Sequence, residues 1–233
     1  MRRLFEERLA AAGVPASPAQ IDALAAFHRM LCAANARMNL TRVPDDPREA
    51  VDRNYIDSLS PLERLRGAAT CVDVGSGAGF PGVPLAIFLP KTRFVMMDSL
   101  NKRVEFLRGA IAELSLNAEA VCLRAEDAGR GAYREAFDAA TARAVAPLNA
   151  LCELMLPLVR VGGMAAALKG PGAAAEAEEA RGALNLLGGR LVSIEEARVP
   201  GRDWAHTLVL LEKTSPTPEK YPRRAGVPER RPL

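Results

Sequence analysis

The sequence lacks the patterns that mark metal sites and disulfide frameworks. Its 233 residues include four cysteines and two histidines. No two cysteines are spaced as C-x-x-C, and both Cys71 and Cys122 fall inside apolar segments. We therefore expect buried, reduced thiols in the cytoplasm and no metal site.

Long hydrophobic runs are also absent. No apolar segment reaches the length needed to cross a bilayer, and residues 1–7 lack the apolar stretch of a signal peptide. Hydrophobic residues make up 49% of the chain and charged residues 25%, as is usual for globular proteins in water. These features predict a cytoplasmic protein that does not enter a membrane. Its length suits one large domain, or one domain with an extension.

An excess of charge of one sign is confined to the C-terminal segment. The whole chain has a formal net charge of +3, while residues 213–233 hold six Lys or Arg and two Glu. The other 212 residues therefore sum to −1. A basic, proline-rich tail on a nearly neutral body predicts an irregular, flexible segment that contacts an anionic partner. The alternative is a solvated tail with no specific role.

A glycine-rich turn after an apolar strand is the most informative stretch of the chain. Residues 68–74 are mostly apolar, and Gly75, Gly77 and Gly79 follow at once. Residues 83–88 then predict a helix. Such a turn lets a ligand approach the backbone, and the helix N-terminus behind it offers unpaired N–H groups. Asp73 lies at the end of the strand, where α/β sheets bind their ligands.

Strands and helices alternate along the rest of the chain. We predict strands at residues 71–74, 93–97, 118–123, 137–142, 164–168, 190–197 and 206–213. Long helices are predicted at residues 48–59 and 173–187, and no helix separates the last two strands, which should pair antiparallel. The pattern predicts an α/β fold with a doubly wound, mostly parallel sheet of seven strands. We expect a helical extension at residues 1–66, the sheet domain at 67–213 and the basic tail at 214–233.

Two cofactors are compatible with the glycine turn. Residues 77–82 read G-x-G-x-x-G, and Asp98 follows 21 residues after Gly77, as in NAD-binding domains. The turn, however, begins at Gly75, directly after the strand, and no separate domain for hydride transfer follows. The two adjacent strands at the end suit a methyltransferase sheet better. An NAD-linked oxidoreductase therefore remains the alternative to a methyltransferase.

The motifs together resemble a known family. The segment from Asp73 to Gly82 (DVGSGAGFPG) and that from Asp98 to Leu107 (DSLNKRVEFL) are similar to the ribosomal RNA small subunit methyltransferase G family, also called glucose-inhibited division protein B. Further matches span nearly the whole chain in the same order: Asn39-Leu40-Thr41, Asp57-Ser58, Arg124-Ala125-Glu126, Arg143-Ala144, Leu168-Lys169-Gly170 and Tyr221-Pro222-Arg223-Arg224. One departure is Asn54, where the family pattern has histidine, so no role of that histidine is carried over.

The resemblance implies a Rossmann-like class I methyltransferase that uses S-adenosylmethionine. It implies methylation of N7 of a specific guanine in the conserved 530 loop of bacterial 16S rRNA, alone or within the small subunit or an assembly intermediate. We expect a monomer. A third possibility is an RNA-binding assembly factor that keeps the fold without turnover.

Site residues follow from the motifs and from the strand ends. The expected cofactor-binding residues are Gly75, Gly77, Gly79, Phe80, Asp98, Ala125, Glu126 and Arg143. Guanine N7 has a free lone pair and no proton, so methyl transfer needs alignment and no general base. Arg143, Lys169 and Asn39 are the expected catalytic residues, in the sense of positioning the base. The expected RNA-binding residues are Arg124, Lys220, Arg223, Arg224, Arg230 and Arg231.

Overall fold

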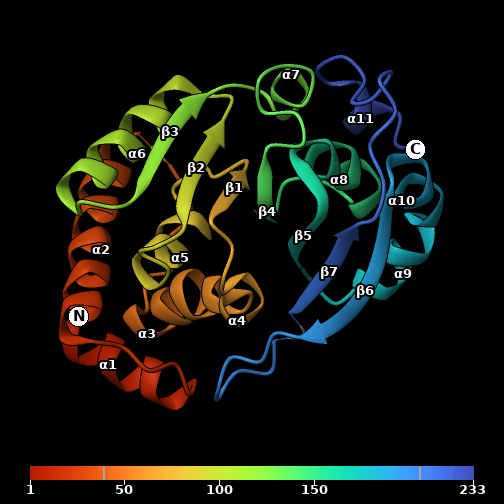
Figure 1. Ribbon diagram of the computed structural model, residues 1–233. Helices are drawn as coiled ribbons and strands as arrows, with labels where there is room; N and C mark the ends of the chain where they lie inside the picture. Colours follow the sequence, from red (N-terminus) through yellow and green to blue (C-terminus); the bar gives the residue numbers. More distant parts are fainter. Residues whose placement is uncertain (39, 205) are drawn as a thin grey trace.

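The computed structural model describes residues 1–38, 40–204 and 206–233, and it shows one sheet covered by helices on both faces (Figure 1). The sheet has seven strands in the order β3-β2-β1-β4-β5-β7-β6. The strands are β1 (Thr70–Val74), β2 (Arg93–Asp98), β3 (Ala118–Cys122), β4 (Phe137–Arg143), β5 (Val159–Lys169), β6 (Gly189–Glu196) and β7 (Thr207–Lys213).

The first five strands run parallel, and the last two pair antiparallel with each other. Strand β7 also pairs antiparallel with β5. This sheet confirms the predicted doubly wound, mostly parallel α/β fold. The order reverses between β1 and β4, and the crevice at such a reversal is where α/β sheets bind ligands.

Helices lie before, between and after the strands. They are α1 (Arg2–Ala11), α2 (Pro18–Met38), α3 (Pro47–Val51), α4 (Leu62–Leu65), α5 (Gly82–Phe88), α6 (Asn101–Glu113), α7 (Ala125–Ala128), α8 (Leu148–Met155), α9 (Ala173–Glu179), α10 (Arg181–Leu187) and α11 (Val227–Arg230).

Alternating strand residues separate the hydrophobic core into two halves. Phe94 and Met96 of β2 face one side, where they meet the N-terminal helices, α5 and α6. Val95 and Met97 of the same strand face the other side, toward α8, α9 and α10. Side chains of a strand alternate between its two faces, so an unbroken apolar run in one strand supplies residues to both halves of the core.

Three predicted elements differ from the observed ones. The helix expected at residues 48–59 is α3 followed by a π-helical turn at Asp52–Ile56 and a 3₁₀ turn at Asp57–Leu59. The helix expected at 173–187 is split at Ala180 into α9 and α10. Strand β5 begins at Val159, because the backbone of Gly162 takes a φ of +82° and forms an irregularity within the strand instead of a turn before it.

The thiols also depart in part from the prediction. Cys71 and Cys152 are buried, as expected, but Cys32 and Cys122 are exposed. Cys122 is the last residue of β3, which forms one edge of the sheet, so its side chain is less covered than those of the central strands. No disulfide joins the described cysteines, and all four are free.

Candidate active site

Two cavities open at the carboxyl ends of the strands. The first, about 90 Å³, follows β1, β2 and β3, and we call it the glycine-turn cavity. It is lined by Val74, Gly75, Met97, Asp98, Ser99, Leu123, Arg124, Ala125, Glu126, Val145, Leu154 and Glu229. The second, about 350 Å³, follows β4 and β5, and we call it the β4–β5 cavity. It is lined by Arg53, Asn54, Asp57, Arg143, Ala144, Leu168, Lys169, Gly170, Glu176 and His206.

The chain after β4 separates the two cavities. Ala144 lines the β4–β5 cavity, while the next residue, Val145, lines the glycine-turn cavity. Ala144 has a φ of +54°, a left-handed conformation that is unfavourable for residues other than glycine. The two cavities are therefore direct neighbours with a strained turn between them.

The glycines of the turn have different surroundings. A Cβ atom on Gly79 would lie 2.8 Å from Val83 and 3.0 Å from Phe27, so this glycine serves tight packing of the turn. A Cβ atom on Gly77 would meet nothing closer than 3.8 Å, although φ at this residue is +56°. The turn thus leaves free space above Gly77, whose N–H bonds Asp98, although of the three predicted glycines only Gly75 lines the glycine-turn cavity.

Asp98 joins the end of β2 to the glycine turn. Its Oδ2 atom accepts a hydrogen bond of 2.9 Å from the Gly77 N–H, and its Oδ1 accepts one of 2.9 Å from the Leu100 N–H. Arg103 donates to the same carboxylate at 3.3 Å. A carboxylate has about four lone-pair positions, so these bonds leave Asp98 capacity to accept from a ligand.

Asp73 is a second acid beside the turn. It is fully buried, and its Oδ2 accepts from the Gly82 N–H at 3.1 Å. Burial raises the pKa of Asp73 to about 7, although the hydrogen bond from Gly82 acts in the opposite direction. A Cβ on Gly82 would lie 2.6 Å from the same oxygen, so this contact depends on glycine.

The residues after β3 are held by the C-terminal segment. The Glu126 carboxylate accepts from the Gly226 N–H at 2.7 Å and from Arg124 at 3.1 Å. Burial alone would raise the pKa of Glu126, but these hydrogen bonds outweigh it and lower the pKa below its ordinary value. Glu229 of α11 contributes to the same cavity and lies 3.8 Å from Arg124.

The tail is mostly irregular, as predicted, with α11 as its one helix among the described residues, but it packs against the sheet domain and is not a free segment. Arg223 forms an ion pair of 2.5 Å with Glu153, whose side chain is fully buried in α8. Figure 1 shows α11 close to α7 and α8. The Arg223 guanidinium is thus committed to the protein, whereas Lys220, Arg224, Arg230 and Arg231 have exposed side chains. A buried carboxylate without a partner is costly, which explains why this part of the tail packs.

Phe80 lies in the hydrophobic core and lines neither cavity. Its ring, 5% exposed, packs edge-on against Phe27 and Tyr55. The guanidinium of Arg143 lies 5.1 Å from the centre of the same ring. Phe80 therefore supports Arg143 from the core side.

The β4–β5 cavity brings the two predicted cations together. Arg143 donates to Asp57 at 3.1 Å and to the Arg53 carbonyl at 2.9 Å. Lys169 lies 2.6 Å from Glu176 and donates to the Ala146 carbonyl at 2.9 Å. Arg143 was also predicted to bind the cofactor, but it lines the β4–β5 cavity and not the glycine-turn cavity. Asn39, the third predicted positioning residue, lies outside the described residues.

The sequence did not single out the groups that hold these cations. Asp57 accepts from Arg143 through one carboxylate oxygen and lies 2.8 Å from His206 Nδ1 through the other. Asp57 belongs to one of the matched dipeptides, which was the available signal. His206 is 149 residues away in sequence, and no local pattern indicates this contact.

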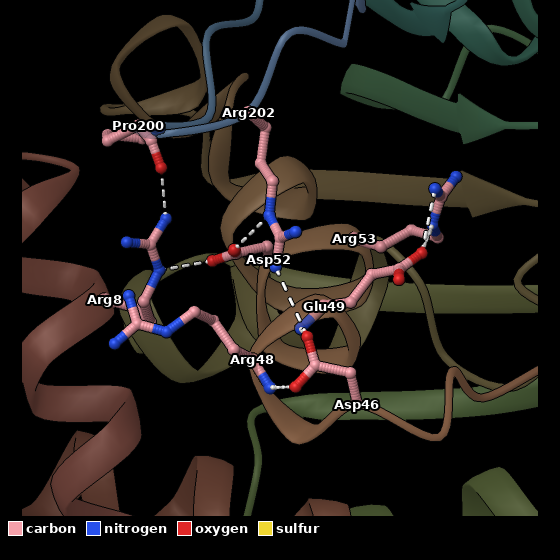
Figure 2. A network of polar contacts seen from close by, with 8 residues as sticks. All are labelled: Arg8, Asp46, Arg48, Glu49, Asp52, Arg53, Pro200 and Arg202. Carbon is pink, nitrogen blue, oxygen red and sulfur yellow. Dashed lines mark hydrogen bonds and ion pairs between the residues drawn. The ribbon is translucent and has the colours of Figure 1, made fainter.

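A buried ion network holds the N-terminal helices beside this cavity (Figure 2). Asp52 is fully buried and forms ion pairs with Arg8 of α1 and with Arg202 of the loop between β6 and β7. Arg8 also donates to the Pro200 carbonyl. The network fixes the π-helical turn at residues 52–56 relative to the β6–β7 loop.

Among the described residues, no group of three or more His, Cys, Asp or Glu side chains is placed to hold a metal ion. Within the same part of the chain, no helix has the length and hydrophobicity to span a membrane.

Solved structures show that this architecture is shared. Cofactor-bound Rv0187 from MTB matches with a TM-score of 0.56 and 21% identity, over 83% of this chain and 91% of that one. The [4+2]-cyclase SpnF matches with a TM-score of 0.57 and 15% identity, over 84% and 94% of the two chains. Likeness at this level establishes the fold, and a cyclase among the neighbours shows that the fold alone does not fix the reaction.

Sequence relatives are much closer. The ribosomal RNA small subunit methyltransferase G of Alkaliphilus metalliredigens (strain QYMF) is 41% identical over 92% of this chain and 91% of its own length. The family model for rRNA small subunit methyltransferase G matches residues 20–204. The resemblance found in the motifs is thereby confirmed, and the chain belongs to the rRNA small subunit methyltransferase G family.

Proposed function

We propose that this chain transfers the methyl group of S-adenosylmethionine to N7 of a guanine in the 530 loop of 16S rRNA. The observation that carries the proposal is the direct neighbourhood of two unlike cavities at the carboxyl edge of the sheet. One is formed by the ends of three strands beside the glycine turn, and the other is lined by ion-paired side chains. Methyl transfer needs a cofactor site and a base site that meet at one point. Here Ala144 lines one cavity and the next residue, Val145, lines the other, so only one peptide unit lies between them.

The residues around the glycine-turn cavity suit the cofactor, and the cavity of about 90 Å³ has room for part of it. The space above Gly77 leaves room for a ligand against the backbone, and Asp98 retains capacity to accept from ribose hydroxyls. Ala125 and Glu126 follow β3, where the main chain and the buried carboxylate would border the adenine. When bound, S-adenosylmethionine supplies an electrophilic methyl group on a cationic sulfur.

The β4–β5 cavity fits a base that reacts without a proton acceptor. N7 attacks with its own lone pair, so the protein has to orient the base and exclude competing geometries. Positive charge moves to the purine as the methyl is transferred. In this cavity the carboxylates of Asp57 and Glu176 lie beside Arg143 and Lys169. Their negative charge offsets the two cations, so the positive charge that develops on the base is not simply repelled.

Contacts with the RNA backbone are assigned to Arg124 and to exposed cations of the C-terminal segment. Arg124 lines the glycine-turn cavity, and Lys220, Arg224, Arg230 and Arg231 are exposed on the C-terminal segment. Phosphate contacts supply affinity and orientation without reading sequence. We infer that the substrate is 16S rRNA, either free or in the small subunit or an assembly intermediate, and that the protein acts in the cytoplasm as a monomer.

The test uses 16S rRNA from a bacterial strain that lacks the modification. The purified chain is incubated with labelled S-adenosylmethionine, and the methylated nucleoside is identified and mapped. The proposal predicts 7-methylguanosine at one position in the 530 loop. Binding of NAD in place of S-adenosylmethionine would support the oxidoreductase alternative, and RNA binding without methyl transfer would indicate an inactive assembly factor.

A further inference from the structure

Asn54 carries an unused hydrogen-bond donor in the β4–β5 cavity. Its side chain is 4% exposed and lines the cavity, and its Nδ2 atom has no hydrogen-bond partner among the described residues. A buried donor without a partner costs stability, so such groups are rare in folded proteins. The missing partner is therefore expected to come from a ligand.

The backbone around Asn54 is fixed on both sides. Asn54 lies in the π-helical turn at Asp52–Ile56. Such turns are uncommon in proteins, and those that occur are often at functional sites. Asp52 is locked by Arg8 and Arg202 (Figure 2), and the Ser58 hydroxyl donates to the Asn54 carbonyl at 2.5 Å. The amide is held at the cavity wall by contacts that do not involve the amide itself.

The two cations of the cavity already have protein partners, although among the described residues Nε and Nη2 of Arg143 and one N–H of Lys169 have none. Arg143 uses Nη1 for Asp57 and the Arg53 carbonyl. Lys169 uses its ammonium group for Glu176 and the Ala146 carbonyl. The Asn54 Nδ2 atom has no partner among the described residues but is covered by protein atoms. A half-turn about the Cβ–Cγ bond, which exchanges Nδ2 with Oδ1, is therefore needed for its N–H groups to meet a ligand in the cavity.

We propose that Asn54 donates to O6 of the target base and thereby selects guanine over adenine. This inference rests on the proposed function and names the residue that reads the base in it. With N7 occupied in the reaction, O6 is the acceptor that remains on the same edge of guanine. Adenine presents an amino group at that position, so two donors would face each other and both would stay unpaired.

The proposal is tested with base analogues at the mapped methylation site. A synthetic segment carrying guanosine, inosine or 2-aminopurine at that position is ligated into 16S rRNA. Inosine keeps O6 and lacks the 2-amino group, while 2-aminopurine has the opposite pattern. Single-turnover rates are measured for the wild type, Asn54→Leu and the control Asn185→Leu, which changes an exposed asparagine of α10.

In the wild type, guanosine and inosine should react within about threefold of each other, and 2-aminopurine at least about tenfold more slowly. Asn54→Leu should slow guanosine and inosine by about tenfold and leave 2-aminopurine nearly unchanged. Asn185→Leu should keep the wild-type rates. The melting temperature of Asn54→Leu should be equal to or higher than that of the wild type, because the unsatisfied donor is removed.

A second variant tests the same contact by reversing it. Asn54→Asp keeps the size and replaces the donor with an acceptor, so it should favour 2,6-diaminopurine over guanosine relative to the wild type. Equal slowing of all analogues in Asn54→Leu, together with no reversal in Asn54→Asp, would overturn the proposal. A wild-type enzyme that leaves 16S rRNA unmethylated would instead contradict the proposed function, so the two failures are distinguishable.

Discussion

The two cavities at the carboxyl edge of the sheet are built in different ways. Most of the glycine-turn cavity consists of residues at the ends of β1, β2 and β3, and its acids are held by backbone N–H groups. The β4–β5 cavity draws on five separate segments, and its cations are held by carboxylates from other elements, a distant one in the case of Arg143. The first is a rigid backbone site, whereas the second is an assembly of side chains. Changes to the first should affect cofactor affinity, and changes to the second should affect the reaction of the base.

The largest effect is expected from Gly77→Val. The new side chain would occupy the open space above the turn, so binding of S-adenosylhomocysteine should weaken by more than about a hundredfold, or about 2.8 kcal/mol. Isothermal titration calorimetry measures the dissociation constant. The control Gly109→Ala changes a glycine of α6 whose Cβ position is also open, and should bind normally. A folded Gly77→Val protein with unchanged affinity would place the cofactor elsewhere.

Asp98→Ala should have the next largest effect. Loss of the acceptor for ribose hydroxyls, and of the bond to the Gly77 N–H, should weaken S-adenosylhomocysteine binding by about 1.5–3 kcal/mol. The exposed Asp127 of α7 provides a control as Asp127→Ala. If the dissociation constants of S-adenosylhomocysteine and of adenosine are both unaltered in Asp98→Ala, the ribose assignment is wrong.

Arg143→Ala and Lys169→Ala change the β4–β5 cavity and should affect the reaction without affecting the cofactor. Each should lower the single-turnover methyl-transfer rate at saturating RNA by about tenfold, because an oriented charge is lost beside the base. Affinity for S-adenosylhomocysteine should stay at the wild-type value. Arg181→Ala, at an exposed arginine of α10, is the matched control. Weaker cofactor binding with a normal transfer rate would show that these residues serve the cofactor and not the base.

The smallest effect is expected from the double variant Arg230→Ala/Arg231→Ala. These side chains are exposed, so their loss should weaken RNA binding about threefold and reduce the slope of log K against log salt by about 1.4, the value for two phosphates of a single strand. Cofactor affinity and the transfer rate should not change. Arg3→Ala/Arg181→Ala removes two other exposed arginines and should leave the salt slope unaltered. An unaltered slope in the first double variant would exclude these residues as phosphate contacts.

The cavity built from strand ends was largely predictable from the sequence. The apolar strand before Gly75 and the acid at Asp98 are local patterns, and parallel strands bring their carboxyl ends together at one edge. Arg143 and Lys169 were expected at that edge for the same reason. The rule that parallel strands end at one edge places Arg143 and Lys169 there, but it does not say which carboxylates pair with them.

The contacts that depend on distant segments were not predictable. Asp57 lies 86 residues from Arg143, and Glu153 lies 70 residues from Arg223. The composition of the tail predicted a solvated segment, because nothing in the sequence indicates that Arg223 pairs with a buried glutamate of α8. Gly79 and Phe80 were grouped with the cofactor residues by their motif, whereas the structure packs both into the core between the turn and the N-terminal helices.

A crystal structure of the protein with S-adenosylhomocysteine would show whether the cofactor binds on the glycine turn and presents its reactive end to the β4–β5 cavity. We expect the ribose to lie against Asp98, the adenine beside Ala125, and the sulfur facing the chain at Ala144. A cofactor bound within the β4–β5 cavity, or one without contact to Asp98, would contradict this expectation.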